Sequence, residues 1–317
     1  MINTLDIGTV RAAADRIAGH VVRTPTLRVR FGDAELLLKP EGLQPTGAFK
    51  LRGAFSLMTR LPADTTGVVA HSSGNHGQAV AYAAATLGLR AVIVMPSDAP
   101  DLKLRRTRAW GAEVVMVGPD SDERAARADE LAGEQGLVPV PPYDHPLIAA
   151  GQGTAALELL EDAGSLDRFY APVSGGGLMA GCATVMHTLC PNAEIVGVEP
   201  ADGDDTLRSL AAGERVSVPP PKTLADGLRV RRPGALTFEV IRRRVARIEL
   251  TTDDELLDAM AWALDELRLV LEPSGAASLA VALREARGRC GVLLSGGNVG
   301  PDLLALVARR PRPQRNT

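Results

Sequence analysis

The sequence predicts an α/β fold in which helices cover both faces of a mostly parallel sheet. Short apolar runs that would form buried strands alternate along the chain with longer segments of helical pattern. These runs are nearly continuous in their apolar residues, as expected of strands that are buried on both faces. Residues 139–146 are rich in proline, which predicts a loop that connects two parts of the molecule.

The individual elements follow from apolar spacing and from loop-forming residues. Residues 6–19 form an amphipathic helix, and a strand at 35–39 is followed by a loop and then by a helix that begins at about Phe49. Further strands are expected at 67–71, 91–95, 113–117, 168–173, 194–198 and 291–294, and further helices at 75–87, 101–110, 122–134, 147–160, 178–189, 253–267, 274–287 and 301–307.

Composition and charge restrict the classes of function. The 317 residues are 45% apolar and 23% charged, with a net charge of −3, so neither nucleic acid nor a membrane surface is an expected partner. Neither a membrane-spanning run nor a secretion signal is recognisable. The cysteines, Cys182, Cys190 and Cys290, lack metal-binding spacing, which suits a reducing compartment. We therefore expect a cytoplasmic protein.

Lys50 stands where a predicted loop becomes a predicted helix. The loop is broken by prolines and glycines, and Phe49 places a ring directly beside the lysine. Partial removal from water lowers the pKa of a lysine, and the resulting neutral amine can attack an aldehyde. On this stretch alone, an ordinary solvated lysine is the simpler interpretation.

A second motif, Ser-Ser-Gly-Asn-His at residues 72–76, follows a predicted strand. Ligands bind at the carboxyl ends of strands in open α/β sheets, and hydroxyl and N–H groups at a helix start can bind a carboxylate. We therefore expect a substrate carboxylate site made by Ser72, Ser73, Asn75 and His76. For His76, a satisfied polar residue is the simpler interpretation.

A third motif, Ser-Gly-Gly-Gly-Leu, joins a predicted strand to a predicted helix. Glycines let the backbone approach an anion, and the helix start offers free N–H groups. The phosphate loop would consist of Ser174, Gly175, Gly176, Gly177 and Leu178. The spacing Gly-x-Gly-x-x-Ala, with a glutamate about 20 residues further on, also fits a dinucleotide-binding loop, so a nicotinamide enzyme stays open on this stretch.

Together with Ser-Gly-Gly-Asn at residues 295–298, these motifs occur in a specific order. The set resembles pyridoxal-phosphate enzymes of the tryptophan-synthase-β type, which have fold type II, and is most similar to threonine/serine dehydratases and serine racemases. The resemblance runs from about residue 23 to residue 298. Departures are Ala48, where relatives more often have serine, and Ser174, where they usually have glycine.

The resemblance implies roles for the residues of these motifs. Pyridoxal 5'-phosphate would be bound covalently by Lys50 beside Phe49, and Lys50 would also take the α-proton. Asn75 would face the phenolic oxygen of the cofactor and Ser295 its ring nitrogen. Ser73 would exchange a proton on the face opposite Lys50. A serine hydroxyl stabilises a pyridinium less than an aspartate does, which favours elimination over transamination.

A cluster of acidic residues follows the predicted strand at 194–198. Carboxylates with a backbone carbonyl suit a hard ion such as Mg²⁺ or Ca²⁺. By resemblance to serine racemases and some dehydratases, the ligands would be Glu199, the carbonyl of Gly203, and Asp205. The alternative is that Asp204 or Asp205 only caps the next helix.

The resemblance also implies two lobes, each an open, mostly parallel sheet with helices on both faces. Residues 55–145 would form the small domain, and residues 1–54 and 146–317 the large, cofactor-binding domain. The expected function is an L-threonine or L-serine ammonia-lyase that gives a 2-oxo acid and ammonium by β-elimination, in a homo-oligomer. Alternatives are a serine racemase, a 3-hydroxyaspartate dehydratase, a nicotinamide-dependent dehydrogenase and an amino-acid sensor without catalytic activity.

Overall fold

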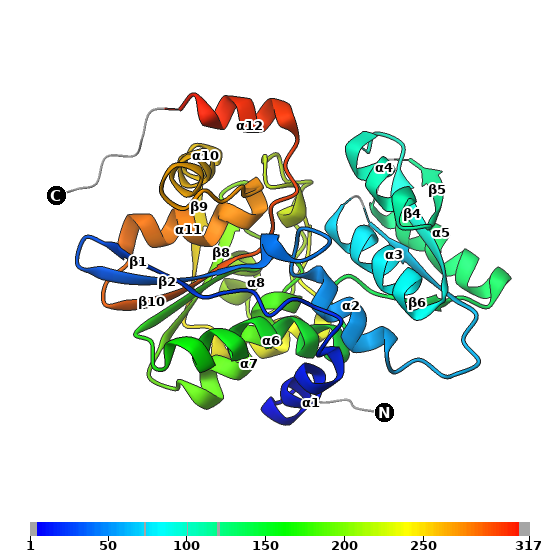
Figure 1. Ribbon diagram of the computed structural model, residues 1–317, viewed down its shortest axis with the longest axis horizontal. Helices are drawn as coiled ribbons and strands as arrows, with labels where there is room; N and C mark the ends of the chain where they lie inside the picture. Colours follow the sequence, from blue (N-terminus) through cyan, green and yellow to red (C-terminus); the bar gives the residue numbers. More distant parts are fainter. Residues whose placement is uncertain (1–4, 73, 100, 119–120, 311–317) are drawn as a thin grey trace.

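The computed structural model describes residues 5–72, 74–99, 101–118 and 121–310. They form two lobes, each built on its own sheet, and the smaller lobe contains α3 (Asn75–Leu87), α4 (Asp101–Ala109) and α5 (Ser121–Gln135) (Figure 1). Most strand pairs are parallel, and helices pack on both faces of each sheet. The predicted fold class is therefore confirmed. No described helix is long and apolar enough to cross a membrane.

The larger sheet has six strands in the order β1-β2-β10-β7-β8-β9. All neighbours are parallel except β1 and β2, which pair as an antiparallel hairpin. The strands are β1 (Leu27–Phe31), β2 (Ala34–Pro40), β7 (Arg168–Pro172), β8 (Glu194–Pro200), β9 (Arg247–Thr251) and β10 (Arg289–Leu294).

The smaller sheet has four parallel strands in the order β5-β4-β3-β6. Its strands are β3 (Gly67–His71), β4 (Arg90–Pro96), β5 (Glu113–Val117) and β6 (Val138–Pro139). The strands of this sheet thus come from one continuous part of the chain, which is flanked on both sides by segments of the larger lobe. The exact domain boundaries at residues 54 and 146 stay a prediction.

In each sheet, successive parallel strands are added on one side, and a later strand is then added on the opposite side of the first; the place between these two strands is the switch point. In the smaller sheet this switch point lies between β3 and β6, and in the larger sheet it lies between β7 and β10. Open α/β sheets form ligand crevices at such points, beyond the carboxyl ends of the strands. The segments after β3, β6, β7 and β10 are therefore the parts of the fold best placed to form a site.

The helices bury apolar faces against these sheets. Side chains alternate along β2, so that Leu37 packs into one core of the larger lobe while Leu36 and Leu38 pack into the other. The helices are α1 (Ile7–Ile17), α2 (Lys50–Met58), α3 (Asn75–Leu87), α4 (Asp101–Ala109), α5 (Ser121–Gln135), α6 (Pro146–Ala163), α7 (Gly177–Leu189), α8 (Asp205–Ala212), α9 (Ala235–Arg244), α10 (Asp253–Trp262), α11 (Pro273–Glu285) and α12 (Pro301–Ala308).

A few elements differ from those expected from the sequence. The strands β1, β6 and β9 and the helix α9 were not predicted. The strand β1 alternates apolar residues with arginines at the sheet edge, and β6 has only two residues, so neither gives a continuous apolar run. The helix expected at 253–267 ends at Trp262 and continues as a π-helical turn over Ala263–Leu267.

Candidate active site

The candidate site lies between the lobes, where residues that follow the switch-point strands meet the start of α2. The backbone N–H of Phe49 donates to the carbonyl of Ser295, just after β10, at 3.1 Å. The Lys50 Nζ donates to the carbonyl of Pro142, shortly after β6, at 2.7 Å. Both contacts join segments that are remote in the sequence, and together they hold the predicted amine at the crevice.

Lys50 is a half-buried amine with a lowered pKa. Burial lowers the pKa of Lys50 to about 8, and its Nζ lies 5.1 Å from the centroid of the Phe49 ring. The chain has three other lysines, Lys39, Lys103 and Lys222. Lys39 is paired with Glu158 and Lys103 with Asp226, while Lys222 is exposed. Among the described residues Lys50 has no carboxylate partner, so it is the lysine best suited to act as a nucleophile.

A buried cluster of charges fixes the start of α2. The guanidinium of Arg52 donates to both carboxylate oxygens of Glu41, at 2.7 and 2.8 Å, and to both of Glu158, at 2.6 and 2.8 Å. Lys39 adds a second cation at 2.7 Å from Glu158. Arg52, Glu41 and Lys39 are fully buried. Because Arg52 lies two positions after Lys50, this cluster sets the place of the reactive amine.

The phosphate loop predicted at residues 174–178 connects β7 to α7. Ser174 and Gly176 have φ of +52° and +90°, and the N-cap of α7 is Gly176, which has no side chain to cap the first N–H groups. The loop is closely packed: a side chain on Gly175 would collide with the ring of Tyr143, and one on Gly176 with Thr237. The start of α7 therefore offers free backbone N–H groups, and the loop before it has no room for side chains on its glycines. Both features are expected of a phosphate site.

The predicted carboxylate loop follows β3. The Oγ of Ser72 accepts a hydrogen bond from the N–H of Gly74 at 3.1 Å, and Asn75 begins α3. His76 is buried and its Nε2 lies 2.8 Å from the carbonyl of Val140, so its ring is turned toward the residue after β6. Burial lowers the pKa of His76 to about 3, which keeps the ring neutral. Ser73 lies outside the described residues.

A network of buried and half-buried polar side chains connects the two lobes. Asn75 donates to Glu272 at 2.6 Å and accepts from the Nδ2 of Asn298 at 2.8 Å. Burial raises the pKa of Glu272 to about 7, while the hydrogen bond from Asn75 opposes this shift. Ser295 is buried, and its Oγ donates to the carbonyl of Ser274 at 3.3 Å. Glu272 and Asn298 therefore join the site, although no role for either was predicted from the sequence.

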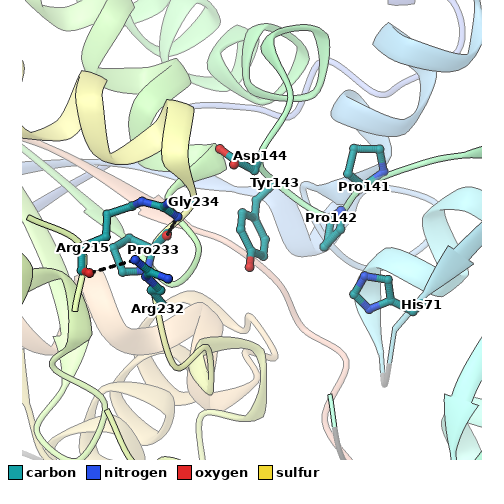
Figure 2. Close-up of a pocket in the computed structure, with 9 residues that line it drawn as sticks. All are labelled: His71, Pro141, Pro142, Tyr143, Asp144, Arg215, Arg232, Pro233 and Gly234. Carbon is teal, nitrogen blue, oxygen red and sulfur yellow. Dashed lines mark hydrogen bonds between the residues drawn. The ribbon is translucent and has the colours of Figure 1, made fainter. Parts of the chain in front are cut away.

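Two contacts from α4 also cross between the lobes. Lys103 forms an ion pair with Asp226, and Arg106 donates to the Oδ1 of Asn298 at 2.7 Å. These contacts could not be predicted from local sequence pattern, because the two partners of each contact lie more than 100 positions apart. A cavity of about 300 Å³ is also lined by residues of both lobes (Figure 2).

Two of the residues predicted to bind a metal ion, Glu199 and Asp205, are buried and near enough for their charges to interact, but one of them is already engaged. The carboxylate of Glu199 accepts from the N–H groups of Thr206 and Leu207 at 3.1 and 3.0 Å, and so caps α8. The carboxylate of Asp205 is buried, and neither oxygen has a hydrogen-bond partner among the described residues. Burial raises the pKa of Asp205 to about 8 and that of Glu199 to about 7.

This arrangement differs from both simple interpretations of the acidic segment. Neither Asp204 nor Asp205 makes the capping hydrogen bonds to α8, because Glu199 makes them. Among the described residues, no group of three or more His, Cys, Asp or Glu side chains could hold a metal ion. The predicted set has only two carboxylates and relies on the carbonyl of Gly203 for its third ligand, so the metal stays a prediction.

The fold and the site together define a class of enzyme. Two open α/β lobes whose switch points meet at a half-buried lysine and a glycine-rich helix start have the architecture of fold type II enzymes. Residues 17–296 match the family described as pyridoxal-phosphate dependent enzymes, and the chain belongs to that family. The family match decides between the two cofactors that the glycine loop allowed, in favour of pyridoxal phosphate.

Individual relatives indicate which enzymes of the family the chain resembles. The L-threo-3-hydroxyaspartate ammonia-lyase of Saccharomyces cerevisiae is 41% identical over 302 residues, which covers 92% of this chain and 93% of the relative. The serine racemase of Schizosaccharomyces pombe is 40% identical and covers 92% and 93%. The solved structure of maize serine racemase has a TM-score of 0.90 and 36% identity, and covers 95% of this chain and 96% of that one. The chain is therefore an enzyme of the ammonia-lyase and racemase group.

Proposed function

We propose that this enzyme removes water and ammonia from L-threonine or L-serine, giving a 2-oxo acid and ammonium. The observation that carries the proposal is the environment of Lys50. Its amine has a pKa lowered to about 8, lacks a carboxylate partner among the described residues, and lies at the crevice between the two switch points. Such an amine can both bind an aldehyde cofactor and accept a proton from a substrate carbon.

The residues present fit pyridoxal phosphate. The uncapped start of α7 and the loop before it would hold the phosphate, with positive φ at Ser174 and Gly176 shaping the turn. The hydroxyl of Ser295, which now donates only to a backbone carbonyl at 3.3 Å, would face the ring nitrogen. Asn75 would face the phenolic oxygen. When bound, the cofactor supplies an electron sink that makes the α-proton of the amino acid acidic.

The chain's own residues would then perform three tasks. Ser72 and the N–H groups at the start of α3 bind the substrate carboxylate, which orients the α-carbon toward Lys50. The neutral Lys50 amine accepts the α-proton. Glu272 holds Asn75 in place from the opposite lobe at 2.6 Å. Loss of the α-proton and the β-hydroxyl together as water gives an enamine, which a second water converts into the 2-oxo acid and ammonium.

Serine racemisation and 3-hydroxyaspartate dehydration are the nearest alternatives. Racemisation needs a second proton carrier on the face opposite Lys50, and the residue predicted for this role, Ser73, lies outside the described residues. The relatives' names include a threonine ammonia-lyase, a serine racemase and a hydroxyaspartate ammonia-lyase. The expected assembly is a homo-oligomer.

We also propose that Glu199, the Gly203 carbonyl and Asp205 bind Mg²⁺ or Ca²⁺, because the buried oxygens of Asp205 have no partner among the described residues.

The proposal is tested by absorption spectroscopy and activity together. We expect the protein with pyridoxal phosphate to show a visible band that borohydride abolishes, with the label recovered on Lys50. The Lys50→Ala variant should lose both the band and the production of 2-oxo acid from threonine or serine. Lys222→Ala, which changes an exposed lysine, is the matched control. Production of 2-oxo acid by Lys50→Ala at the wild-type rate would refute the proposal.

A further inference from the structure

The cavity in the crevice combines residues from both lobes beside the candidate site (Figure 2). His71 lines it from the small lobe and immediately precedes Ser72 of the predicted carboxylate loop. Pro142 lines it as well, and the carbonyl of Pro142 accepts the hydrogen bond from Lys50 at 2.7 Å. The cavity therefore reaches Pro142, whose carbonyl holds the reactive amine, and His71, the last residue of β3 before the predicted carboxylate loop.

The opposite wall of this cavity carries two arginines. Arg215 and Arg232 lie beside one another, and each guanidinium donates to a backbone carbonyl: Arg215 to Pro233 at 3.2 Å and Arg232 to Arg215 at 3.1 Å (Figure 2). In the described part of the chain, the partners of both guanidinium groups are these backbone carbonyls and not carboxylates. Because a guanidinium has five N–H donors, most of their donors stay available to a ligand.

The one carboxylate that lines the cavity is committed elsewhere. Asp144 accepts hydrogen bonds from the N–H groups of Ala235, Leu236 and Thr237 at 2.8 to 3.2 Å, and so caps the start of α9. The histidine of the cavity, His71, has a pKa lowered by burial and by the charge of Arg124. Asp144 keeps its negative charge, but two guanidinium groups line the cavity with this one carboxylate, so the lining has a net positive charge.

We propose that Arg215 and Arg232 form a subsite for a second carboxylate, so that the enzyme also accepts a β-hydroxy amino diacid such as 3-hydroxyaspartate, beside threonine and serine. This inference rests on the proposed elimination and extends only the range of its substrates. The diacid loses its α-proton and β-hydroxyl as water, and hydrolysis of the enamine releases ammonium and a four-carbon 2-oxo diacid. An arginine fork matches a carboxylate with two parallel N–H···O bonds, which threonine and serine side chains cannot form.

An anion at this wall has a second conceivable source, the phosphate of the cofactor. Tyr143 lines the cavity and packs its ring against Gly175 of the phosphate loop, so the two anion sites are neighbours. The two sources make different predictions. Arginines that bind the substrate affect one substrate far more than another, whereas arginines that bind the cofactor phosphate weaken cofactor affinity and slow all substrates alike.

The test compares kcat/KM for L-threo-3-hydroxyaspartate and L-threonine in the cofactor-saturated enzyme, following 2-oxo acid formation. Arg215→Met and Arg232→Met are each expected to lower kcat/KM for the diacid by about 10- to 100-fold, and that for threonine much less. Arg215→Lys keeps the charge but not the fork, and should give an intermediate loss through KM. Arg243→Met removes an exposed arginine of α9 as the matched control.

The possible outcomes are distinguishable. Equal losses on both substrates, with a weaker dissociation constant for pyridoxal phosphate by absorbance titration, would assign the arginines to the cofactor and overturn the proposal. A wild-type enzyme that converts threonine or serine but not the diacid would also overturn it, while leaving the proposed function intact. An enzyme that converts none of the three and forms no visible band would refute the proposed function itself.

Discussion

Asn75 donates a hydrogen bond from Nδ2 to the Oε1 of Glu272 at 2.6 Å, although the two residues are 197 positions apart. Asn75 begins α3 in the small lobe, and Glu272 directly precedes α11 in the large lobe. The same carboxylate packs so closely against Gly296 that a side chain there would collide with it. One buried acid thus joins the predicted carboxylate loop to the segment that carries Ser295.

The Glu272 carboxyl should make stability depend on pH. Its pKa is raised from 4.5 to about 7, so the folded state holds this proton more tightly than the unfolded chain does. Its contribution to the free energy of unfolding is therefore present below about pH 4.5 and is lost as the pH rises through about 7. We expect the stability of cofactor-free wild type relative to Glu272→Gln to fall over this range. Urea denaturation of both proteins at several pH values measures it, and a constant difference would contradict it.

The lowered pKa of Lys50 should appear in the rate at which the cofactor-free protein binds pyridoxal phosphate. Only the neutral amine attacks the aldehyde, and burial brings the pKa of Lys50 to about 8. The rate of growth of the visible band should therefore rise with pH and level off above about pH 8. A blocked lysine in solution, measured alongside, should keep accelerating to about pH 10. If the rates for the protein and for the blocked lysine levelled off at the same pH, the lowered pKa of Lys50 would be refuted.

Arg52 should be among the most sensitive positions of the fold. Replacing it by methionine would leave Glu41 and Glu158 without their main cation in a buried site, at a cost of about 3 to 5 kcal/mol in the free energy of unfolding. Arg52→Lys keeps the charge but loses the bidentate geometry, so its loss should be smaller. Arg127→Met, at an exposed ion pair, should change stability by less than about 1 kcal/mol. Chemical denaturation gives all three values.

Ser174 adopts a left-handed conformation, with φ of +52°, that favours glycine. Its hydroxyl compensates in part by donating to the carbonyl of Gly227 at 3.0 Å. Ser174→Ala keeps the strain and loses that bond, whereas Ser174→Gly removes both. We expect the glycine variant to be more stable than the alanine variant by about 1 to 2 kcal/mol. Arg268, with φ of +60°, is the control: its Gly and Ala variants should differ similarly without changing cofactor affinity. An alanine variant as stable as the glycine variant would contradict the strain.

The sequence predicted those parts of the site that depend on local pattern. Apolar runs marked β3, β7 and β10, and the glycine and serine motifs directly after them lie at the carboxyl ends of these strands. Lys50 was expected at a helix start and is the first residue of α2. These features were predictable because each depends on neighbours within a few residues.

Features that depend on remote packing could not be predicted in this way. Glu199 has the spacing of a dinucleotide-binding acid, yet its carboxylate caps α8. The Nε2 of His76 lies within hydrogen-bond distance of the carbonyl of a residue 64 positions away in the sequence. The carboxylate that accepts from Asn75 is 197 positions away. Arg215 and Arg232 come from irregular segments with no periodic signal. In each case tertiary contacts decide the direction of a side chain that local pattern leaves open.

A divalent metal ion should stabilise this protein through Asp205. Both oxygens of that buried carboxylate lack a hydrogen-bond partner among the described residues, and because burying its charge without a partner is costly, its pKa is raised to about 8. An ion held between Asp205, the Gly203 carbonyl and Glu199 would remove that cost, and Ca²⁺ or Mg²⁺ should therefore raise the melting temperature of the wild type and EDTA should reverse the shift. Asp205→Asn should abolish the response, whereas Asp202→Asn, which changes an exposed acid of the same turn, should retain it. Glu199 is the weaker ligand of the set because it already binds two N–H groups of α8. A melting temperature that is unaffected by either ion would show that Glu199 and Asp205 serve the fold alone.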